Sequence, residues 1–203
     1  MTNRNKTYPS FTTDDIRQLG ISMQSGSVMP MPVPPLAPSA WLRLTLEKNS
    51  RLPMVTEKAK SELIVSPILT ELHESNLEVF TFFSGSTFDV QKDIGLKGRC
   101  DFLLSRKPHA IVPEAPVFAI VEAKNDSLED GYAQCVAQLY AAEIFNQRNH
   151  SAFPFLFGAV TTGFLWKFIR YADKSATVHT EIFYMENLDE LLGALQTVVD
   201  FYK

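Results

Sequence analysis

Apolar residues recur at helical intervals over residues 39–76, which predicts helices in that region. The segment SAWLRLTLEK, residues 39–48, begins with a serine that can cap a helix and continues with spaced apolar residues. Residues 56–76, TEKAKSELIVSPILTELHESN, repeat apolar residues at intervals of three and four. Because Pro67 falls inside this second pattern, we expect the helix to kink or restart there.

The pattern changes to that of β-strands from Leu77 onward. Residues 77–90, LEVFTFFSGSTFDV, read as a strand that is broken or bulged at the Ser-Gly-Ser of residues 84–86. Residues 100–106, CDFLLSR, form a second short strand candidate. Residues 117–124, VFAIVEAK, are apolar on both faces until the last three positions, which is typical of a central strand covered on both sides.

A long helix is predicted at residues 126–147, where Ser127 and Asp130 could form a capping box. Three further strands are expected at residues 155–163, 163–171 and 176–185, followed by a closing amphipathic helix at residues 188–202. We therefore predict an α/β fold with a mixed central β-sheet flanked by helices. Its core order is α-βββ-α-β, and a C-terminal hairpin and helix complete it.

The first 40 residues differ from the rest, and we predict a proline-rich N-terminal arm at 1–40 and a single domain at 41–203. Prolines at positions 30, 32, 34, 35 and 38 disfavour a helix and favour an extended conformation. A short helix around residues 13–19, capped by Thr12 or Thr13, can precede this stretch. A tether or an oligomer contact is one interpretation of the arm, and a PxxP ligand motif is the other.

Composition and charge place only loose bounds on function. The formal charge of -4 and the pI near 5.6 argue against a protein that coats DNA, although they allow a local basic groove. No run of about 18 apolar residues predicts a membrane span, and residues 1–11 lack the apolar stretch of a secretory signal. The two cysteines, Cys100 and Cys135, are too few for a disulfide framework, so reduced thiols in a cytoplasmic protein are expected.

The charges at the end of VFAIVEAK are the strongest indication of chemistry. Side chains two positions apart on a strand point the same way, so Glu122 and Lys124 share one face. Such charges are costly to bury unless they are paired or bind a metal ion. By itself the triplet is weak, because a chain with 23 acidic residues is expected to contain about one acid-x-lysine triplet by chance. A salt bridge at a strand end is the alternative interpretation.

Asp101 strengthens the case for a metal site. It lies 21 residues before Glu122, at the start of the strand expected to pair with VFAIVEAK in the antiparallel sense. That pairing would set the two carboxylates side by side, where they repel each other unless a cation lies between them. Lys124 partly offsets this repulsion and can orient or help to deprotonate a water molecule. Such a site suits phosphodiester hydrolysis with Mg²⁺.

The segments GRCDFLL and FAIVEAK, within this order of elements, resemble the PD-(D/E)xK nuclease superfamily, which includes restriction enzymes, exonucleases and Holliday-junction resolvases. The resemblance covers about residues 56–170 and implies a restriction-endonuclease-like core. It implies that Asp101 and Glu122 bind metal, with the backbone carbonyl of Ala123 as a further ligand, and that Lys124 positions water. Glu62 matches a glutamate that many members carry on the preceding helix; the alternative is an exposed helix charge.

Two further features bear on the resemblance. Cys100 stands where the namesake motif has proline. Some branches place a glutamine on the second helix that helps to set substrate and active-site geometry, and Gln138, with Gln134 one turn earlier, is the matching candidate. Tyr140 follows, but the Gln-x-x-x-Tyr spacing of those branches is not met. Solvated polar residues are the alternative interpretation of both glutamines.

Basic residues surround the predicted meander and could contact phosphates, or could form a solvated edge: Lys92, Lys97, Arg99, Arg106 and Lys107. The four histidines show no metal-ligand spacing and are expected to be surface or structural residues. The chain has no phosphate-binding glycine loop.

Two functions are therefore carried forward. The first is a metal-dependent nuclease that hydrolyses DNA phosphodiester bonds in restriction, defence or repair, with Mg²⁺ or Mn²⁺ as cofactor. The second is a catalytically silent nucleic-acid-binding or assembly module that retains the nuclease fold. DNA is the expected partner and no membrane is involved. A homodimer would supply the two sites that cutting both strands usually needs. The choice of DNA or RNA, and of endo- or exonucleolytic action, stays open.

Overall fold

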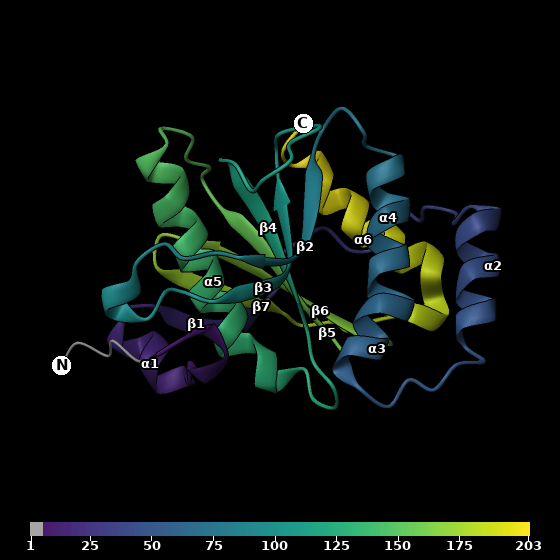
Figure 1. The fold of residues 1–203 in the computed structure, drawn as a ribbon, viewed down its shortest axis with the longest axis horizontal. Helices are drawn as coiled ribbons and strands as arrows, with labels where there is room; N and C mark the ends of the chain where they lie inside the picture. The colour runs from purple at the N-terminus through teal and green to yellow at the C-terminus, as the bar shows by residue number, and fades with distance from the viewer. Residues whose placement is uncertain (1–5) are drawn as a thin grey trace.

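The computed structural model describes residues 6–203 and forms a mixed sheet covered by helices on both faces (Figure 1). The strands are β1 (Ser22–Gly26), β2 (Thr81–Thr87), β3 (Arg99–Ser105), β4 (Val117–Ala123), β5 (Leu156–Thr161), β6 (Leu165–Ala172), β7 (Ser175–His179) and β8 (Phe183–Tyr184). The α-helices are α1 (Thr13–Gln18), α2 (Ala40–Asn49), α3 (Glu57–Lys60), α4 (Ser66–Glu74), α5 (Glu129–Arg148) and α6 (Leu188–Asp200). Short 3₁₀ helices lie at Tyr8–Ser10, Lys92–Ile94 and Met185–Asn187.

The sheet has the strand order β1-β7-β6-β5-β4-β3-β2, and β8 pairs with β6. Strands β4 and β5 are parallel, as are β1 and β7, whereas the other neighbours are antiparallel. A parallel neighbour requires a crossover, and α5 provides the one between β4 and β5. The predicted α/β class, the mixed sheet and its flanking helices are confirmed.

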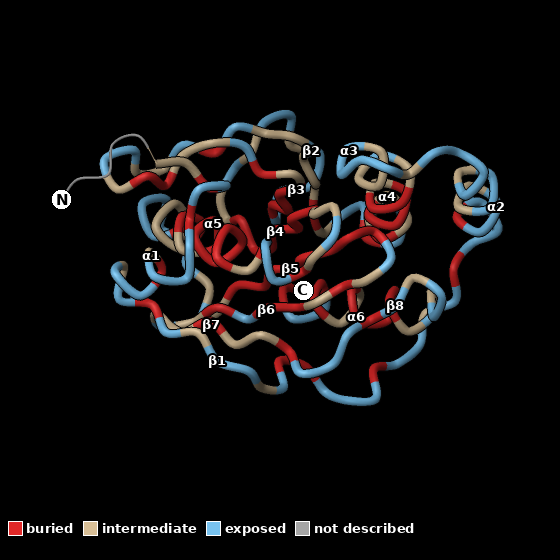
Figure 2. The backbone as a smooth tube through the Cα atoms, turned by 90° about the horizontal axis from the view of Figure 1, so that it is seen from below, coloured by how far each residue is buried: buried red, intermediate tan, exposed pale blue. Residues whose placement is uncertain are grey.

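Each face of the sheet has its own hydrophobic core. Helix α5, together with α1, covers one face, and α4 and α6 cover the other (Figure 1). Strand β4 is buried along its whole length because both faces are covered, in agreement with its nearly continuous apolar sequence. The buried segments gather in the central strands and in the helix faces turned toward them (Figure 2).

The predicted helix at residues 56–76 changes geometry before Pro67. Helix α3 passes into a π-helical segment, Ser61–Val65, and α4 begins at Ser66. Pro67 has no N–H to donate to the carbonyl of Leu63, four residues earlier. That carbonyl instead accepts a hydrogen bond from the side-chain amide of Asn49 on α2, at 2.7 Å. The expected disruption is present, and a neighbouring helix satisfies the carbonyl that the proline leaves free.

The N-terminal region packs into the same structure. Helix α1 begins after Thr12, whose hydroxyl accepts from the backbone N–H of Asp15, as expected for a cap. Strand β1 extends the sheet alongside β7, and the extended residues that follow run to α6, where Leu36 N–H donates to the carbonyl of Asp189. The first five residues of the predicted arm lie outside the described residues. The division into an arm and a domain stays a prediction.

Two local expectations had different outcomes. The predicted capping box of Ser127 and Asp130 is wrong: α5 is capped at Leu128, and the Ser127 hydroxyl accepts from the backbone N–H of Glu129 and donates to its carboxylate instead of pairing with Asp130. The predicted C-terminal hairpin is present as β6 and β7. Its two turn residues, Asp173 and Lys174, both have positive φ, as in a type I′ turn. No helix within residues 6–203 has the length and apolar character to cross a bilayer.

Candidate active site

Strands β3 and β4 bring Asp101 next to Glu122. Their antiparallel register pairs Phe102 with Val121, so the next position sets Asp101 beside Glu122. The backbone N–H of Ala123 donates to Asp101 Oδ2 at 2.8 Å, which fixes this carboxylate against the end of β4. The pairing expected from the sequence is therefore present, and it unites residues that are 21 positions apart.

Glu122 is only 1% exposed and accepts hydrogen bonds from three side chains. Lys124 Nζ lies 2.8 Å from Oε1. The side-chain amide of Gln134 donates to the same oxygen, and that of Gln138 donates to Oε2 at 2.9 Å. Lys124 also donates to Gln134 Oε1 at 3.1 Å. Strand β4 and helix α5 together thus hold the carboxylate and the ammonium group in one buried network.

Electrostatics at Glu122 favour the neutral acid at neutral pH even with the Lys124 ammonium beside it. Burial raises the pKa of Glu122 to about 8, and the negative charge of Asp101 contributes, against the opposing effects of Lys124 and Gln138. Burial opposes the charged form of Lys124, but the acidic side chains of Glu122, Glu57 and Asp101 together outweigh it and raise the pKa of Lys124. A neutral Glu122 leaves Asp101 as the more accessible negative charge of the pair.

A pocket of about 330 Å³ opens onto Asp101, whereas Glu122 lies behind it. The pocket is lined from the helical segment by Glu57, Lys58, Ser61 and Glu62, and from the sheet by Ser84, Gly85, Arg99, Asp101 and Ala123. A ligand entering here would reach Asp101 and the end of β4 from the side of α3. The pocket thus lies between the sheet and the helical segment that begins with α3.

The predicted helix glutamate, Glu62, lines this pocket but is turned toward solvent. Its side chain is 62% exposed and pairs with Lys58 at 3.4 Å, so its role as a metal ligand stays a prediction. Glu57, which the sequence analysis did not single out, is coupled to the site. Desolvation raises the pKa of Glu57, the charge of Lys124 opposes this shift, and the charge of Asp101 adds to it. Its position at the start of α3, after the Thr56 cap, was the available signal.

Gln134 and Gln138 are buried, so the interpretation of these residues as solvated polar groups is wrong. Both orient Glu122, and their predicted contact with a substrate stays a prediction. Gln138 donates through its amide nitrogen, and its Oε1 is buried without a partner among the described residues. The two glutamines lie one turn apart on α5, which lets both reach a single carboxylate.

The carboxylate donors of the site have the chemistry that a divalent cation requires. Carboxylate oxygens are the ligands that Mg²⁺ prefers, and the negative charge of Asp101 raises the pKa of both Glu57 and Glu122. A cation would relieve that repulsion, so the donors fit. Within residues 6–203, no three His, Cys, Asp or Glu side chains converge closely enough to form a complete metal-binding group.

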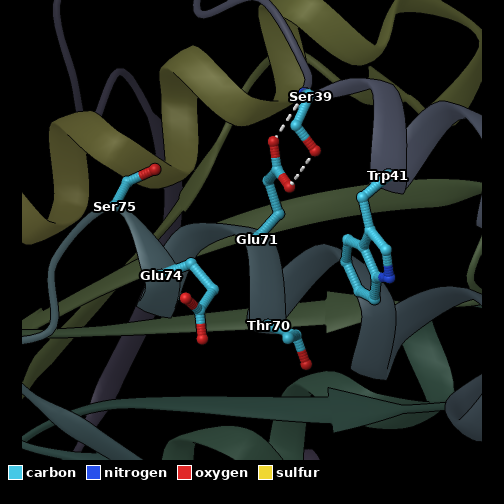
Figure 3. A pocket seen from close by; sticks show the side chains of 6 residues that line it. All are labelled: Ser39, Trp41, Thr70, Glu71, Glu74 and Ser75. Carbon is cyan, nitrogen blue, oxygen red and sulfur yellow. Dashed lines mark hydrogen bonds between the residues drawn. The ribbon is translucent and has the colours of Figure 1, made fainter.

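A second pocket, of about 540 Å³, shares no residue with the site (Figure 3). Trp41, on α2, flanks it, and Glu71 and Glu74 of α4 line its acidic side. The carboxylate of Glu71 accepts from the N–H and the hydroxyl of Ser39, at 2.6 and 2.7 Å. Glu71 therefore fixes the start of α2 on α4, which is a structural role.

The cysteines and the buried histidine are structural. Cys100 and Cys135 are free and buried, in agreement with the expected reduced thiols. His179 is buried at the end of β7, where its Nδ1 accepts from the N–H of Val28 at 3.1 Å.

Comparison with known protein families, curated proteins and solved structures found no match to this chain.

Proposed function

We propose that this chain is a metal-dependent nuclease with a restriction-endonuclease-like core, which hydrolyses DNA phosphodiester bonds in restriction, defence or repair. The observation that carries the proposal is the ion pair of the buried Glu122 with the half-buried Lys124 beside Asp101, at the end of a central strand. Maintaining these charges in a core is costly, and a purely structural strand end has no need of all three.

In this proposal each side chain has a separate task. Asp101 and Glu122 would supply carboxylates and the backbone carbonyl of Ala123 a further oxygen, while Glu57 lines the same pocket from the helical side. A bound Mg²⁺ or Mn²⁺ would polarise water and neutralise charge on the scissile phosphate. Lys124, held between Glu122 and Gln134, orients the attacking water and holds a proton beside it. Gln134 and Gln138 keep the carboxylate of Glu122 in one orientation.

A silent nucleic-acid-binding or assembly module is the second candidate. The hydrogen bonding of Glu122 favours this candidate, because both carboxylate oxygens already accept hydrogen bonds from protein groups. In that case the network would only stabilise the fold. The two candidates differ in whether a cation binds at Asp101 and Glu122 and whether a phosphodiester bond is cut.

The test is cleavage of linear, nicked and single-stranded DNA by the purified full chain with Mg²⁺ or Mn²⁺. We expect Lys124→Ala to lower kcat at least 100-fold, because proton handling typically contributes about 10²–10⁴ in rate. Calorimetric binding of Mn²⁺ should survive in Lys124→Ala and be lost in Asp101→Asn. An Arg106→Gln variant, at the far end of β3, controls for loss of charge. Absence of both cleavage and metal binding under every condition would refute the nuclease and leave the silent module.

A further inference from the structure

The five basic residues that the sequence places around the meander lie in different parts of the structure. Arg106 lies after the end of β3, where its guanidinium donates to the backbone carbonyl of Lys203 at 2.7 Å. Lys92 pairs with Asp89 at 2.9 Å. Lys107 follows Arg106 in the connection to β4. Of the five, only Arg99 lines the pocket that opens onto Asp101.

Arg99 is exposed, and the described residues leave most of its donors free. Its Nε donates to the backbone carbonyl of Gly85 at 2.8 Å, and within residues 6–203 its guanidinium forms no ion pair with a carboxylate. The other cation of the pocket, Lys58, pairs with Glu62. Because a guanidinium carries five N–H donors, one bond to Gly85 orients the group and leaves its terminal nitrogens available.

Gly85 lies directly against that guanidinium. Regular pairing between β2 and β3 joins Ser84 to Phe102 and Ser86 to Cys100, so Gly85 lies opposite Asp101. Its φ of +61° is one that other residues rarely adopt. A Cβ at this position would lie 2.9 Å from Nη2 of Arg99. The missing side chain therefore lets the guanidinium lie against the strand, at the mouth of the pocket.

The chemistry of this arrangement selects an anion that offers two oxygen acceptors in one plane. A guanidinium oriented through Nε presents its terminal N–H groups as a fork that matches two phosphate oxygens. The hydroxyls of Ser61 and Ser84 line the same pocket and can donate to the same kind of ligand. Arg99, on the side of the pocket opposite the helix carboxylates, would attract a phosphodiester to Asp101 despite the acidic charge of the chain.

We propose that Arg99, held by Gly85, is a substrate-binding residue that clamps a backbone phosphate of DNA beside the phosphodiester at Asp101. This rests on the proposed nuclease function, and it explains how a chain of net charge -4 can hold a polyanion at its site. The contact is with phosphate, so Arg99 contributes affinity and register and reads no base.

Binding of a short fluorescent DNA duplex to the full chain tests the proposal. The salt dependence is measured in EDTA, so that no hydrolysis occurs. Arg99→Gln is expected to weaken binding about tenfold and to reduce the log–log salt slope by about one, since each lost phosphate contact removes about 0.9 from the slope. Arg99→Lys should restore the salt slope but only part of the affinity, because it keeps the charge and loses the fork. In cleavage assays, Arg99→Gln should raise KM far more than it lowers kcat.

Arg106→Gln is the matched control, because it removes the same charge at the opposite end of β3. An equal loss of affinity and slope in both variants would overturn the clamp and indicate only long-range attraction. Unchanged binding in Arg99→Gln, or no DNA binding by the parent chain at low salt, would also overturn it. If the parent chain binds DNA through Arg99 yet cuts none, the clamp stands and the nuclease proposal fails, so the two failures are distinguishable.

Discussion

Glu122 combines two demands that usually conflict in a folded protein. It is nearly inaccessible to solvent, yet it lies beside the negative charge of Asp101. The three donors around it, from Lys124, Gln134 and Gln138, compensate for only part of that cost, and its pKa remains at about 8. The residue is therefore expected to reduce the stability of the metal-free protein as the pH rises above 4.5.

This expectation has a defined sign. The pKa of Glu122 is raised in the folded chain from an ordinary value of 4.5 to about 8, so the folded state keeps a proton that the unfolded state releases. The free energy of unfolding in EDTA should fall as the pH rises from 4.5 to about 8, relative to Glu122→Gln, which cannot titrate. Urea unfolding of both proteins across this range measures the difference. Identical pH profiles for the two proteins would contradict the prediction.

Metal ions add a second measurement to the same pair of proteins. If a cation binds Asp101 and Glu122, saturating Mn²⁺ should stabilise the parent chain most at pH 8, where Glu122 must otherwise lose its proton unaided. Glu122→Gln should show little of this stabilisation. A gain of equal size in both proteins would place the ion elsewhere.

At the scale of elements, local sequence patterns predicted most of the helices and strands but not the π-helical segment before the meander. The serine cap of α2, the apolar run of β4 and the disruption at Pro67 are local patterns, and each is present in the structure. The π-helical segment is not a local pattern. Its turns contain more residues than α-helical turns, so the residues before the segment are rotated about the helix axis relative to those after it.

The acidic residues of the same region also could not be ranked from local pattern alone. Glu57 and Glu62 are five positions apart, and simple helical spacing cannot tell which one turns toward Asp101. The pairing of β3 with β4 could be predicted because a short connection joins two strand-like segments, and it brought Asp101 to Glu122. The inward turn of Gln134 and Gln138 required the docking of α5, which alternation of residue types does not encode.

Asn49 is expected to stabilise the disrupted helix through its bond to the Leu63 carbonyl. Asn49→Ala should lower the free energy of unfolding by about 1 kcal/mol, because it leaves a partly buried carbonyl without a donor. In a Pro67→Ala background the same change should cost less, since residue 67 would then carry an N–H for that carbonyl. A double-mutant cycle by urea unfolding measures the coupling, and strictly additive effects would argue against it.

At the scale of the whole molecule, the N-terminal segment links the two ends of the chain. Its strand β1 completes one edge of the sheet, and the extended residues after β1 reach α6, the last helix. There Gly193 lies against the backbone of Pro34, and a Cβ at Gly193 would overlap the Pro34 carbonyl oxygen. The close approach of the segment to α6 depends on this glycine.

Gly193→Ala should therefore destabilise the protein, although alanine is ordinarily better than glycine inside a helix by about 1 kcal/mol. We expect the free energy of unfolding to fall by about 1–3 kcal/mol, because the added methyl group forces the segment and α6 apart. Urea unfolding measures the loss, and faster proteolysis between residues 27 and 39 would locate it. Stabilisation by the alanine would show that the segment is not held at this point.

The connection between β3 and β4 lies at the end of the sheet away from the candidate site, since Asp101 comes early in β3 and Glu122 late in β4. Its tip carries Ile111, which is 92% exposed, and no helix or strand of the chain includes it. A reporter peptide or a fluorophore-bearing loop inserted at this tip would thus be remote from the carboxylates and from Arg99. The molecule can be labelled, immobilised or tethered from one pole while the candidate site at the other pole stays open to solvent.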